Sequence, residues 1–326
     1  MLQYPYMSTQ PSKNVLVTGG AGYIGSACVA ALLEVGHSVT VFHDLSTGQR
    51  EKVPAAATLI TGDITDAAAL RAACGSAPFD AVIHFAAKKA VAESEANPSL
   101  YMQTNVVGSC NLLAAMSEFA IPQLIFSSSA AVYQPPAAGL VTERTPLEPV
   151  NVYVMTKKLV EDIIYQYFRT GQLKHYHCLR YFNVAGDAGL HYQEQNAQNV
   201  FPLIASAAKA KQPFYIFGSD YDTPDGTCVR DYIHLNDLVS AHLAAFNSQQ
   251  DGIYNLGTST GYSVRELAEA FNEALPEPLI VELAERRLGD PAALVADGSK
   301  AKQDLGWQPT KTLADMVEST LKVYMN

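Results

Sequence analysis

The feature that most constrains the fold of this 326-residue chain is a glycine loop close to its start. An apolar run, Val-Leu-Val-Thr, leads directly into Gly19, Gly22 and Gly25, and a helical pattern follows. Glycine is needed where a turn is tight, where backbone approaches a pyrophosphate, and where a helix packs closely on a strand. The N-terminus of the following helix favours an anionic group. The loop therefore predicts a dinucleotide-binding site.

Short apolar runs and longer helical patterns alternate through the first half of the chain. Continuous apolar strands separated by helices are typical of a parallel sheet that is covered on both faces. The handedness of such crossovers makes the predicted fold α/β, a Rossmann-type doubly wound parallel sheet. We expect strands at 15–17, 39–42, 59–60, 81–85 and 124–126, and helices at 23–35, 67–73, 100–119 and 152–168.

The texture changes after about residue 183, where loops lengthen and the helical patterns become sparser. Helices are expected at 264–274 and 313–323, an extended run at 279–283, and a strand followed by a helix at 231–246. We predict a smaller C-terminal α/β substrate domain. The expected division is a flexible tail (1–12), an NAD-binding domain (13–182, rejoined by 231–258) and the substrate domain (183–230 and 259–326).

Composition excludes several classes of protein. The net charge of −10 disfavours a nucleic-acid partner, since the phosphate backbone would be repelled. Five scattered cysteines without paired or clustered spacing indicate reduced thiols and no metal site. We find neither a signal peptide nor an apolar run long enough to cross a membrane. A cytoplasmic protein without a membrane partner is expected.

An acid at the end of the second strand is the next requirement for dinucleotide binding. Asp44 lies about twenty residues beyond the glycines, as the pattern asks, and follows His43. A carboxylate there accepts from both ribose hydroxyls and repels a 2′-phosphate, which favours NAD over NADP. Asp63 follows the third strand, where it could accept from the adenine amino group or cap a helix, a role that Thr65 or Asp66 could equally fill.

Tyr153 and Lys157 lie four residues apart, on one face of a predicted helix. A lysine ammonium near a phenol, together with the positive nicotinamide ring of the cofactor, favours phenolate and lets the tyrosine act as a base near neutrality. Ser129 ends a predicted strand twenty-four residues before Tyr153, at the edge where parallel sheets bind ligands. The order of glycine loop, serine strand end and Tyr-x-x-x-Lys predicts an active site, with Ser129 bridging the reacting oxygen and the tyrosine.

These motifs resemble the extended short-chain dehydrogenase/reductases, and further stretches resemble the UDP-glucose 4-epimerases within that family. The resemblance covers nearly the whole chain after residue 13. The similar stretches are VIHFAAKKAVAES (82–94), RYFNVAG (180–186), FGSDY (217–221), DGTCVRDYIHL (225–235), YNLG (254–257), RRLGD (286–290) and the segment 297–307, which ends in Leu-Gly-Trp.

The resemblance implies roles for individual residues. Tyr153 would take the proton of the C4 hydroxyl, with Lys157 lowering its pKa and holding the nicotinamide ribose. Arg230 and Arg287 would bind the diphosphate of a UDP-sugar. NAD would line up against Gly19, Gly22, Tyr23, Ile24, Gly25, His43, Asp44, Asp63, Ile64, Phe85, Ala86, Lys89, Asn105 and Phe182, and the substrate against Asn183, Asn199, Phe217, Arg230, Arg287, Asp290 and Leu294.

The reaction implied is oxidation and re-reduction at one carbon. Hydride leaves C4 for NAD, the 4-keto sugar turns over while the nucleotide stays anchored, and hydride returns to the other face. The cofactor ends unchanged, so tight retention of NAD is expected. Such enzymes use a two-helix dimer face, and the helices at 100–119 and 152–168 could supply it, so we expect a homodimer.

Several positions depart from the family pattern. His43 occupies the usual place of the ribose-binding acid, and Val154 replaces the usual glycine after the tyrosine, adding bulk near the cleft. Leu294 occupies the position that gates the sugar's C2 substituent, and leucine is intermediate between residues that admit and exclude N-acetyl sugars.

Three kinds of alternative function follow from the sequence. A 4-epimerase of UDP-N-acetylglucosamine, UDP-glucuronate or a UDP-pentose shares the same chemistry. A sugar dehydratase needs an acid where Ala130 and Ala131 lie, which argues against it. An inactive NAD-sensing protein is opposed by the intact Ser129, Tyr153 and Lys157.

Overall fold

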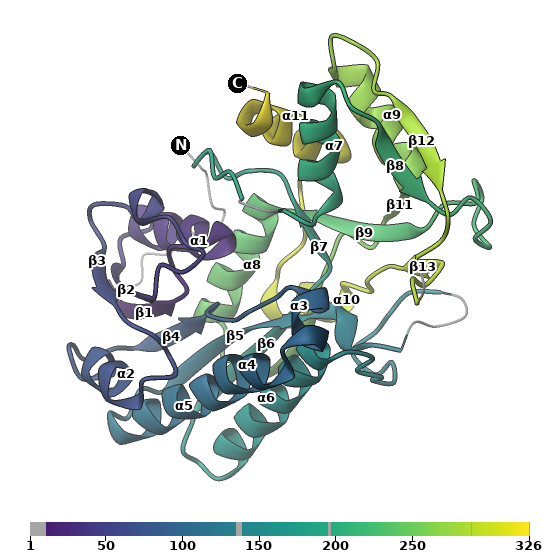
Figure 1. Cartoon of the computed structure of the whole chain (residues 1–326). Helices are drawn as coiled ribbons and strands as arrows, with labels where there is room; N and C mark the ends of the chain where they lie inside the picture. Colours follow the sequence, from purple (N-terminus) through teal and green to yellow (C-terminus); the bar gives the residue numbers. More distant parts are fainter. Residues whose placement is uncertain (1–10, 135–138, 195–196, 288, 326) are drawn as a thin grey trace.

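The computed structural model in Figure 1 describes residues 11–134, 139–194, 197–287 and 289–325. Most of the predicted flexible tail, residues 1–10, lies outside this range. The polypeptide forms a large sheet flanked by helices, and a smaller group of strands and helices lies beyond one edge of it (Figure 1).

The large sheet has seven strands in the order β10-β6-β5-β4-β1-β2-β3. Every neighbouring pair is parallel. The chain runs outward from β1 to β3 on one side and from β4 to β6 on the other, so a topological switch point lies between β1 and β4. The strands are β1 (Asn14–Thr18), β2 (Ser38–His43), β3 (Thr58–Thr61), β4 (Ala81–His84), β5 (Gln123–Ser129), β6 (His175–Tyr181) and β10 (Gly252–Leu256).

Helices cover both faces of this sheet, because its strands are apolar on both sides. One buried cluster joins the sheet to α1, α8 and α10, and a second joins the opposite face to α2, α5 and α6. The predicted α/β doubly wound fold is confirmed. The helices are α1 (Tyr23–Glu34), α2 (Ala67–Cys74), α3 (Val91–Ala96), α4 (Pro98–Tyr101), α5 (Gly108–Glu118), α6 (Val152–Arg169), α8 (Leu235–Asn247) and α10 (Ser299–Leu305).

The helix expected over 100–119 is not one regular α-helix. α4 passes into a π-helical stretch, Met102–Val107, before α5 begins. Asn105 lies in that stretch, and its side chain bonds to groups outside the helix, at Lys88 and Thr156. Local widening of a helix is often found where a side chain is used in this way.

The smaller part of the molecule is built on two short sheets. One contains β11, β9 and β13, with β7 also paired to β9, and the other pairs β8 with β12. A separate apolar cluster joins these strands to α7, α9 and α11. The elements are β7 (Asn183–Ala185), α7 (Val200–Ala210), β8 (Phe214–Phe217), β9 (Val229–His234), β11 (Gly261–Ser263), α9 (Val264–Ala274), β12 (Val281–Ala284), β13 (Ala293–Leu294) and α11 (Leu313–Tyr324).

The segment expected to return to the large sheet is shared between both parts. Strand β9 belongs to the small sheet, whereas α8 packs on the large sheet and β10 forms its edge. The chain therefore crosses between the two parts several times. The division into domains at the predicted residues stays a prediction.

Candidate active site

The glycine loop lies at the switch point, between β1 and the N-terminus of α1. Gly19 has φ +76°, and a Cβ there would lie 2.5 Å from the backbone nitrogen of Ala86. A Cβ on Gly25 would lie 2.3 Å from the carbonyl oxygen of Gly19. Helix α1 begins at Tyr23 with no side-chain cap and no acid in its first turn. Such a helix end can accept an anionic diphosphate, so the loop fits the group that the sequence predicts.

His43 and Asp44 lie at the end of β2, where the sequence predicts that the adenosine ribose binds. The His43 ring is buried, and its Nδ1 accepts from the backbone N–H of Leu45 at 2.7 Å. Asp44 is more exposed, and contact with His43 and the N–H of Ser46 holds the pKa of its carboxyl well below the usual range. A negative charge therefore stands at this edge, as the prediction of NAD requires.

Asp63 follows β3 but does not cap the next helix. Its Oδ1 accepts from the N–H of Thr65 at 2.8 Å, and Asp66 caps α2 by accepting from Ala68 and Ala69. The capping role that the sequence left open thus belongs to Asp66. Ile64, beside it, is buried against Gly108.

The segment after β4 carries three further predicted cofactor residues, and they differ in exposure. Phe85 is half-buried and its ring lies 4.9 Å from that of His242. The following residue, Ala86, closes on Gly19. Lys89 is largely exposed and pairs with Glu194 from the other part of the molecule. This ion pair links the segment after β4 to the smaller part of the molecule.

Asn105 is nearly fully buried and its amide is satisfied by protein groups. Its Oδ1 accepts from the N–H of Lys88 at 2.8 Å, and its Nδ2 donates to the Lys88 carbonyl at 3.0 Å and to Thr156 Oγ1 at 2.9 Å. The side chain therefore ties the segment after β4 to α6. We interpret Asn105 as a residue that shapes the predicted cofactor site.

Ser129, Tyr153 and Lys157 lie at the carboxyl edge of β5 and the start of α6. Ser129 is the last residue of β5, and its hydroxyl hydrogen-bonds to Tyr153. Asn151 caps α6 by accepting from Val154, which fixes where the helix begins. Lys157 lies one turn after Tyr153 and donates from Nζ to the carbonyl of Ser127 at 2.7 Å. The structure therefore brings the three predicted catalytic residues together.

The electrostatics of this set show how far the lysine alone can favour phenolate. Burial raises the pKa of Tyr153 above its ordinary value, and the hydrogen bond with Ser129 offsets only part of that rise. Lys157 Nζ lies 6.0 Å from the centre of the Tyr153 ring, and burial lowers the pKa of Lys157 to about 8. The lysine neighbour alone thus does not hold the phenol ionised. A second positive charge is needed near the ring.

An apolar cluster lies beside Tyr153 and connects it to the smaller part of the molecule. Val154 is fully buried in this cluster with Phe182, and Tyr153 and Leu294 pack against it. Val154 is therefore buried beside three predicted site residues and presents no exposed surface of its own. Leu294 lies in the same neighbourhood as Tyr153, as the prediction that it gates the sugar requires.

The predicted substrate-binding cations lie on β9 and in the loop that follows β12. Arg230 on β9 donates from Nη1 to the carbonyls of Val229 and Pro291, both at 2.8 Å. Its Nη2 lies 3.7 Å from Asp290 Oδ1. Arg287 lies over the ring of Phe217, with 3.9 Å between Cζ and the ring centre. Arg230 therefore pairs with Asp290, and not with its neighbour Asp231.

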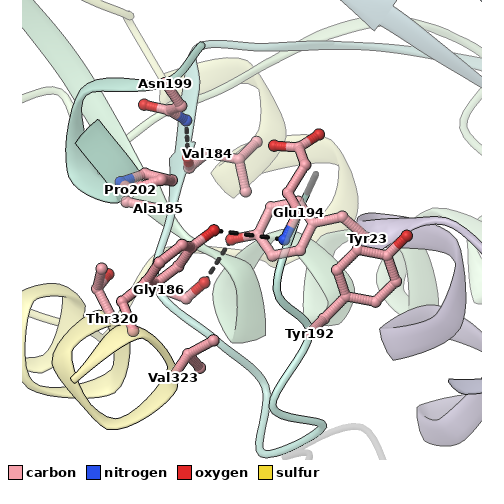
Figure 2. A pocket seen from close by; sticks show the side chains of 11 residues that line it. Tyr23, Val184, Ala185, Gly186, Tyr192, Glu194, Asn199, Pro202, Thr320 and Val323 are labelled. Atoms are coloured by element: carbon pink, nitrogen blue, oxygen red, sulfur yellow. Dashed lines mark hydrogen bonds between the residues drawn. The ribbon is translucent and has the colours of Figure 1, made fainter. Parts of the chain in front are cut away.

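The remaining two predicted substrate residues lie near the start of β7 and of α7. Asn183 is exposed, and its side chain hydrogen-bonds to Tyr232. Asn199 donates to the carbonyl of Val184 and lines a pocket with Tyr23 and Glu194 (Figure 2). A predicted cofactor residue and a predicted substrate residue therefore face the same pocket.

Sequence reasoning missed the segment 187–194, which crosses from the smaller part to the cofactor side. Lys52 donates from Nζ to the carbonyl of Leu190 at 2.9 Å, and Gln49 donates to the carbonyl of Gln193 at 2.8 Å. Asp187 holds the turn through the N–H groups of Gly189, His191 and Tyr192. An acid between two glycines, Gly186 and Gly189, is a weak signal. This crossing was therefore not predicted from the sequence.

Two absences concern only the part of the chain that the structure describes. No group of three or more His, Cys, Asp or Glu side chains there is arranged to hold a metal ion. Among the same residues we find no helix with the length and apolarity that a membrane crossing needs.

Side chains suited to proton transfer thus stand beside a dinucleotide crevice at the switch point of a parallel sheet, which defines the class as a dinucleotide-dependent α/β enzyme. The model of the NAD dependent epimerase/dehydratase family matches residues 15–257, and the chain belongs to that family. The resemblance predicted from sequence is confirmed, and so is the prediction of NAD at the level of the family.

Individual relatives have a more specific activity than the family description gives. A UDP-glucose 4-epimerase of Corynebacterium glutamicum is 44% identical over 303 residues, which are 91% of each chain. The structure of a UDP-glucose 4-epimerase from Stenotrophomonas maltophila with bound NAD and formylated UDP-arabinopyranose is 36% identical, with a TM-score of 0.92 over 96% of this chain and 98% of that one. A UDP-glucose 4-epimerase from Bifidobacterium longum in complex with NAD+ and UDP is also 36% identical, with a TM-score of 0.88 over 96% of this chain and 98% of that one.

Proposed function

We propose that this chain is a UDP-glucose 4-epimerase, which interconverts UDP-glucose and UDP-galactose by inverting C4 through a transient 4-keto sugar. The observation that carries the proposal is the hydrogen-bonded pair of Ser129 and Tyr153, with Lys157 buried behind it, at the carboxyl edge of β5. Similarity to UDP-glucose 4-epimerases over 91% of each chain supports the choice of substrate.

The chain's own residues have distinct roles in this reaction. Tyr153 takes the proton of the C4 hydroxyl and later returns one to the same oxygen. Ser129 donates to and accepts from the sugar oxygen and the tyrosine, so that the proton moves along a short path. Lys157, held by the Ser127 carbonyl, supplies positive charge from behind.

NAD, when bound, accepts hydride from C4 and gives it back, and its nicotinamide ring supplies a positive charge. The residues that fit it are the glycine loop, the uncapped start of α1 and the carboxylate of Asp44. A second positive charge is what the raised pKa of Tyr153 requires. The proposed base therefore becomes effective only in a cofactor-loaded site.

The substrate nucleotide is proposed to bind in the small sheets while the sugar turns. Arg230 and Arg287 would meet the diphosphate, Asp290 a ribose hydroxyl, and Phe217 the uracil ring. Arg230 is already held by two carbonyls, so it can offer charge without losing much side-chain freedom. Asn183 and Asn199 complete the proposed set of polar contacts.

Turnover of UDP-galactose tests the proposal. Purified protein is mixed with UDP-galactose without added NAD, and formation of UDP-glucose is followed. Tyr153→Phe is expected to lower kcat by about 10²- to 10⁴-fold, the usual contribution of a general base, while NAD and UDP stay bound. Undiminished inversion by this variant would refute the assignment of the base.

Two alternative functions remain. Leu294 is half-buried and packs against the same cluster as Tyr153, so other UDP-sugars, UDP-N-acetylglucosamine first, are alternative substrates. A panel with UDP-glucose, UDP-N-acetylglucosamine and UDP-glucuronate separates them. Bound NAD with no turnover on any of these sugars would favour the NAD-sensing alternative.

We also propose that the protein is a cytoplasmic homodimer. Four large apolar side chains on the two segments predicted to form the dimer face are between 39% and 47% exposed. They are Leu100, Val107, Met155 and Tyr165. Exposed apolar side chains of this kind suit an interface between two copies. Five free cysteines fit a reducing compartment. Light scattering at two protein concentrations checks the dimer.

A further inference from the structure

A buried ion pair lies one helical turn beyond the proposed catalytic lysine. Arg180 on β6 donates from Nε to Glu161 Oε1 at 2.8 Å, and its Nη2 pairs with Oε2. Both side chains are only 2% exposed. Ser128 adds a third donor to the same carboxylate at 2.5 Å. Removing both charges from water costs free energy, so apolar residues of similar size in these places would stabilise the fold about as well.

The position of the pair suggests what it is for. Glu161 follows Lys157 by four residues on α6, so the two side chains lie on one face of the helix. Two neighbouring residues of β5 hydrogen-bond to these side chains. The Ser127 carbonyl accepts from Lys157, and the Ser128 hydroxyl donates to Glu161. The pair and the lysine therefore share one scaffold.

Other charged or titratable groups around Lys157 are few. His84 on β4 is buried, and burial lowers its pKa to about 3, with Lys157 acting in the same direction, so it brings no charge at neutral pH. Tyr153 and Tyr181 have pKa values raised by burial and are neutral in this state. The same cause raises the pKa of the Cys178 thiol. Glu161 is thus the anion that acts on the lysine, and Arg180 is the cation next to that anion.

We propose that Glu161 and Arg180 form a positioning pair that keeps the Lys157 ammonium charged and in place behind Tyr153. The inference rests on the proposed role of Lys157 in the reaction. Burial lowers the pKa of Lys157 to about 8, and the Glu161 carboxylate opposes burial. Arg180 holds that carboxylate in a fixed direction by donating to both of its oxygens. Neither residue touches the substrate in this scheme.

The expected size of the effect follows from the helix spacing. Side chains one turn apart are about 6 Å from each other, and in a medium of effective dielectric about 20 a unit charge at that distance shifts a pKa by about two units. Loss of the Glu161 charge with Arg180 left in place is therefore expected to lower the pKa of Lys157 by about two units, a hundredfold change in the ratio of ammonium to amine. Loss of both charges is expected to lower it by about one unit, because the repulsion from Arg180 is removed as well.

The titration of Lys157 can be measured directly. Protein is labelled with carbon-13 lysine, the Lys157 signal is assigned with Lys157→Met, and its ε-carbon shift is followed against pH. Glu161→Gln is expected to lower the pKa of Lys157 by about two units. The matched control is Asp162→Asn, which removes an exposed acid from the next position of the same helix and should leave the titration unchanged.

The double variant Glu161→Gln with Arg180→Gln leaves no uncompensated charge and guards against a single variant that does not fold. Its Lys157 pKa should fall between those of the wild type and of Glu161→Gln, since both the attracting and the repelling charge are gone. An unchanged Lys157 pKa in both Glu161 variants would overturn the proposal, as would a shift of equal size in Asp162→Asn.

Kinetics give a second readout. With UDP-galactose, the alkaline limb of the kcat profile should move to lower pH in Glu161→Gln by the same amount as the lysine titration, with KM little changed. A purely structural pair would lower activity equally at every pH. Absence of turnover in the wild type would refute the proposed function alone, because the titration needs no substrate.

Discussion

A single buried histidine should account for a measurable part of this protein's sensitivity to acid. His242 on α8 has no exposed surface, and its ring lies 4.9 Å from that of Phe85 and 5.6 Å from that of Tyr181. Its Nδ1 donates to the Leu238 carbonyl at 2.8 Å, while Nε2 has no hydrogen-bond partner among the described residues. Protonation of that nitrogen would bury an unpaired charge, so burial lowers the pKa of His242 to about 4.

The sign and size follow from linkage between protonation and folding. The folded-state pKa lies below the unfolded value of 6.5, so the neutral ring's contribution to stability is complete above that value. It is lost as the pH falls from about 6.5 towards 4. At pH 5 the unfolded state gains about 2 kcal/mol over the folded state through this one proton. His242→Phe keeps an aromatic ring in the site and removes the proton.

Urea unfolding at pH 7.5 and pH 5, followed by the fluorescence of the single buried tryptophan, Trp307, tests this. Between the two pH values the free energy of unfolding of His242→Phe should fall by about 2 kcal/mol less than that of the wild type. His191→Asn, at an exposed histidine, is the control and should lose as much stability as the wild type. Equal losses in all three proteins would refute the reasoning.

Three further predictions concern the cofactor and substrate. Gly25→Ala places a methyl group 2.3 Å from the Gly19 carbonyl, so the start of α1 must shift; the NAD retained after gel filtration should drop at least about tenfold, and wild-type retention would contradict the close approach. Leu294→Ser should raise kcat/KM for UDP-N-acetylglucosamine relative to UDP-glucose by about tenfold, and an unchanged ratio in the substrate panel would exclude a gate there. Arg287→Met keeps an apolar contact with the Phe217 ring but removes a charge, so calorimetry should show UDP binding about 10- to 100-fold weaker; unaltered affinity would place the diphosphate elsewhere.

Predictions from sequence were most successful where the pattern is local. The glycine loop was identified because its spacing reports a steric requirement within a few residues, and the structure shows that requirement at Gly19 and Gly25. The capping of α2 was left open among Asp63, Thr65 and Asp66, because all three lie close to the helix start. The path of the chain after β3 places Asp66 at the cap position.

Contacts between distant segments were not predicted. Glu161 and Arg180 are nineteen residues apart and lie on a helix and a strand, and nothing in either local pattern pairs them. Lys89 and Glu194 are 105 residues apart and meet because the chain crosses from one part of the molecule to the other. Arg230 pairs with Asp290, sixty residues away, because the parallel pairing of β13 with β9 brings the segment before β13 close to it.

The sequence by itself determined the class of fold, the glycine loop and the spacing of Tyr153 from Lys157, because hydrophobic period, backbone sterics and helix geometry act within a few residues. Only the tertiary structure decided how these groups are charged and held. The pKa of Tyr153 is raised and that of Lys157 lowered by burial, and burial is a property of the packed molecule. Val154 is buried in a cluster with Ala130, Val132 and Phe182, from the segments that follow β5 and β6, and no run of residues around position 154 contains that information.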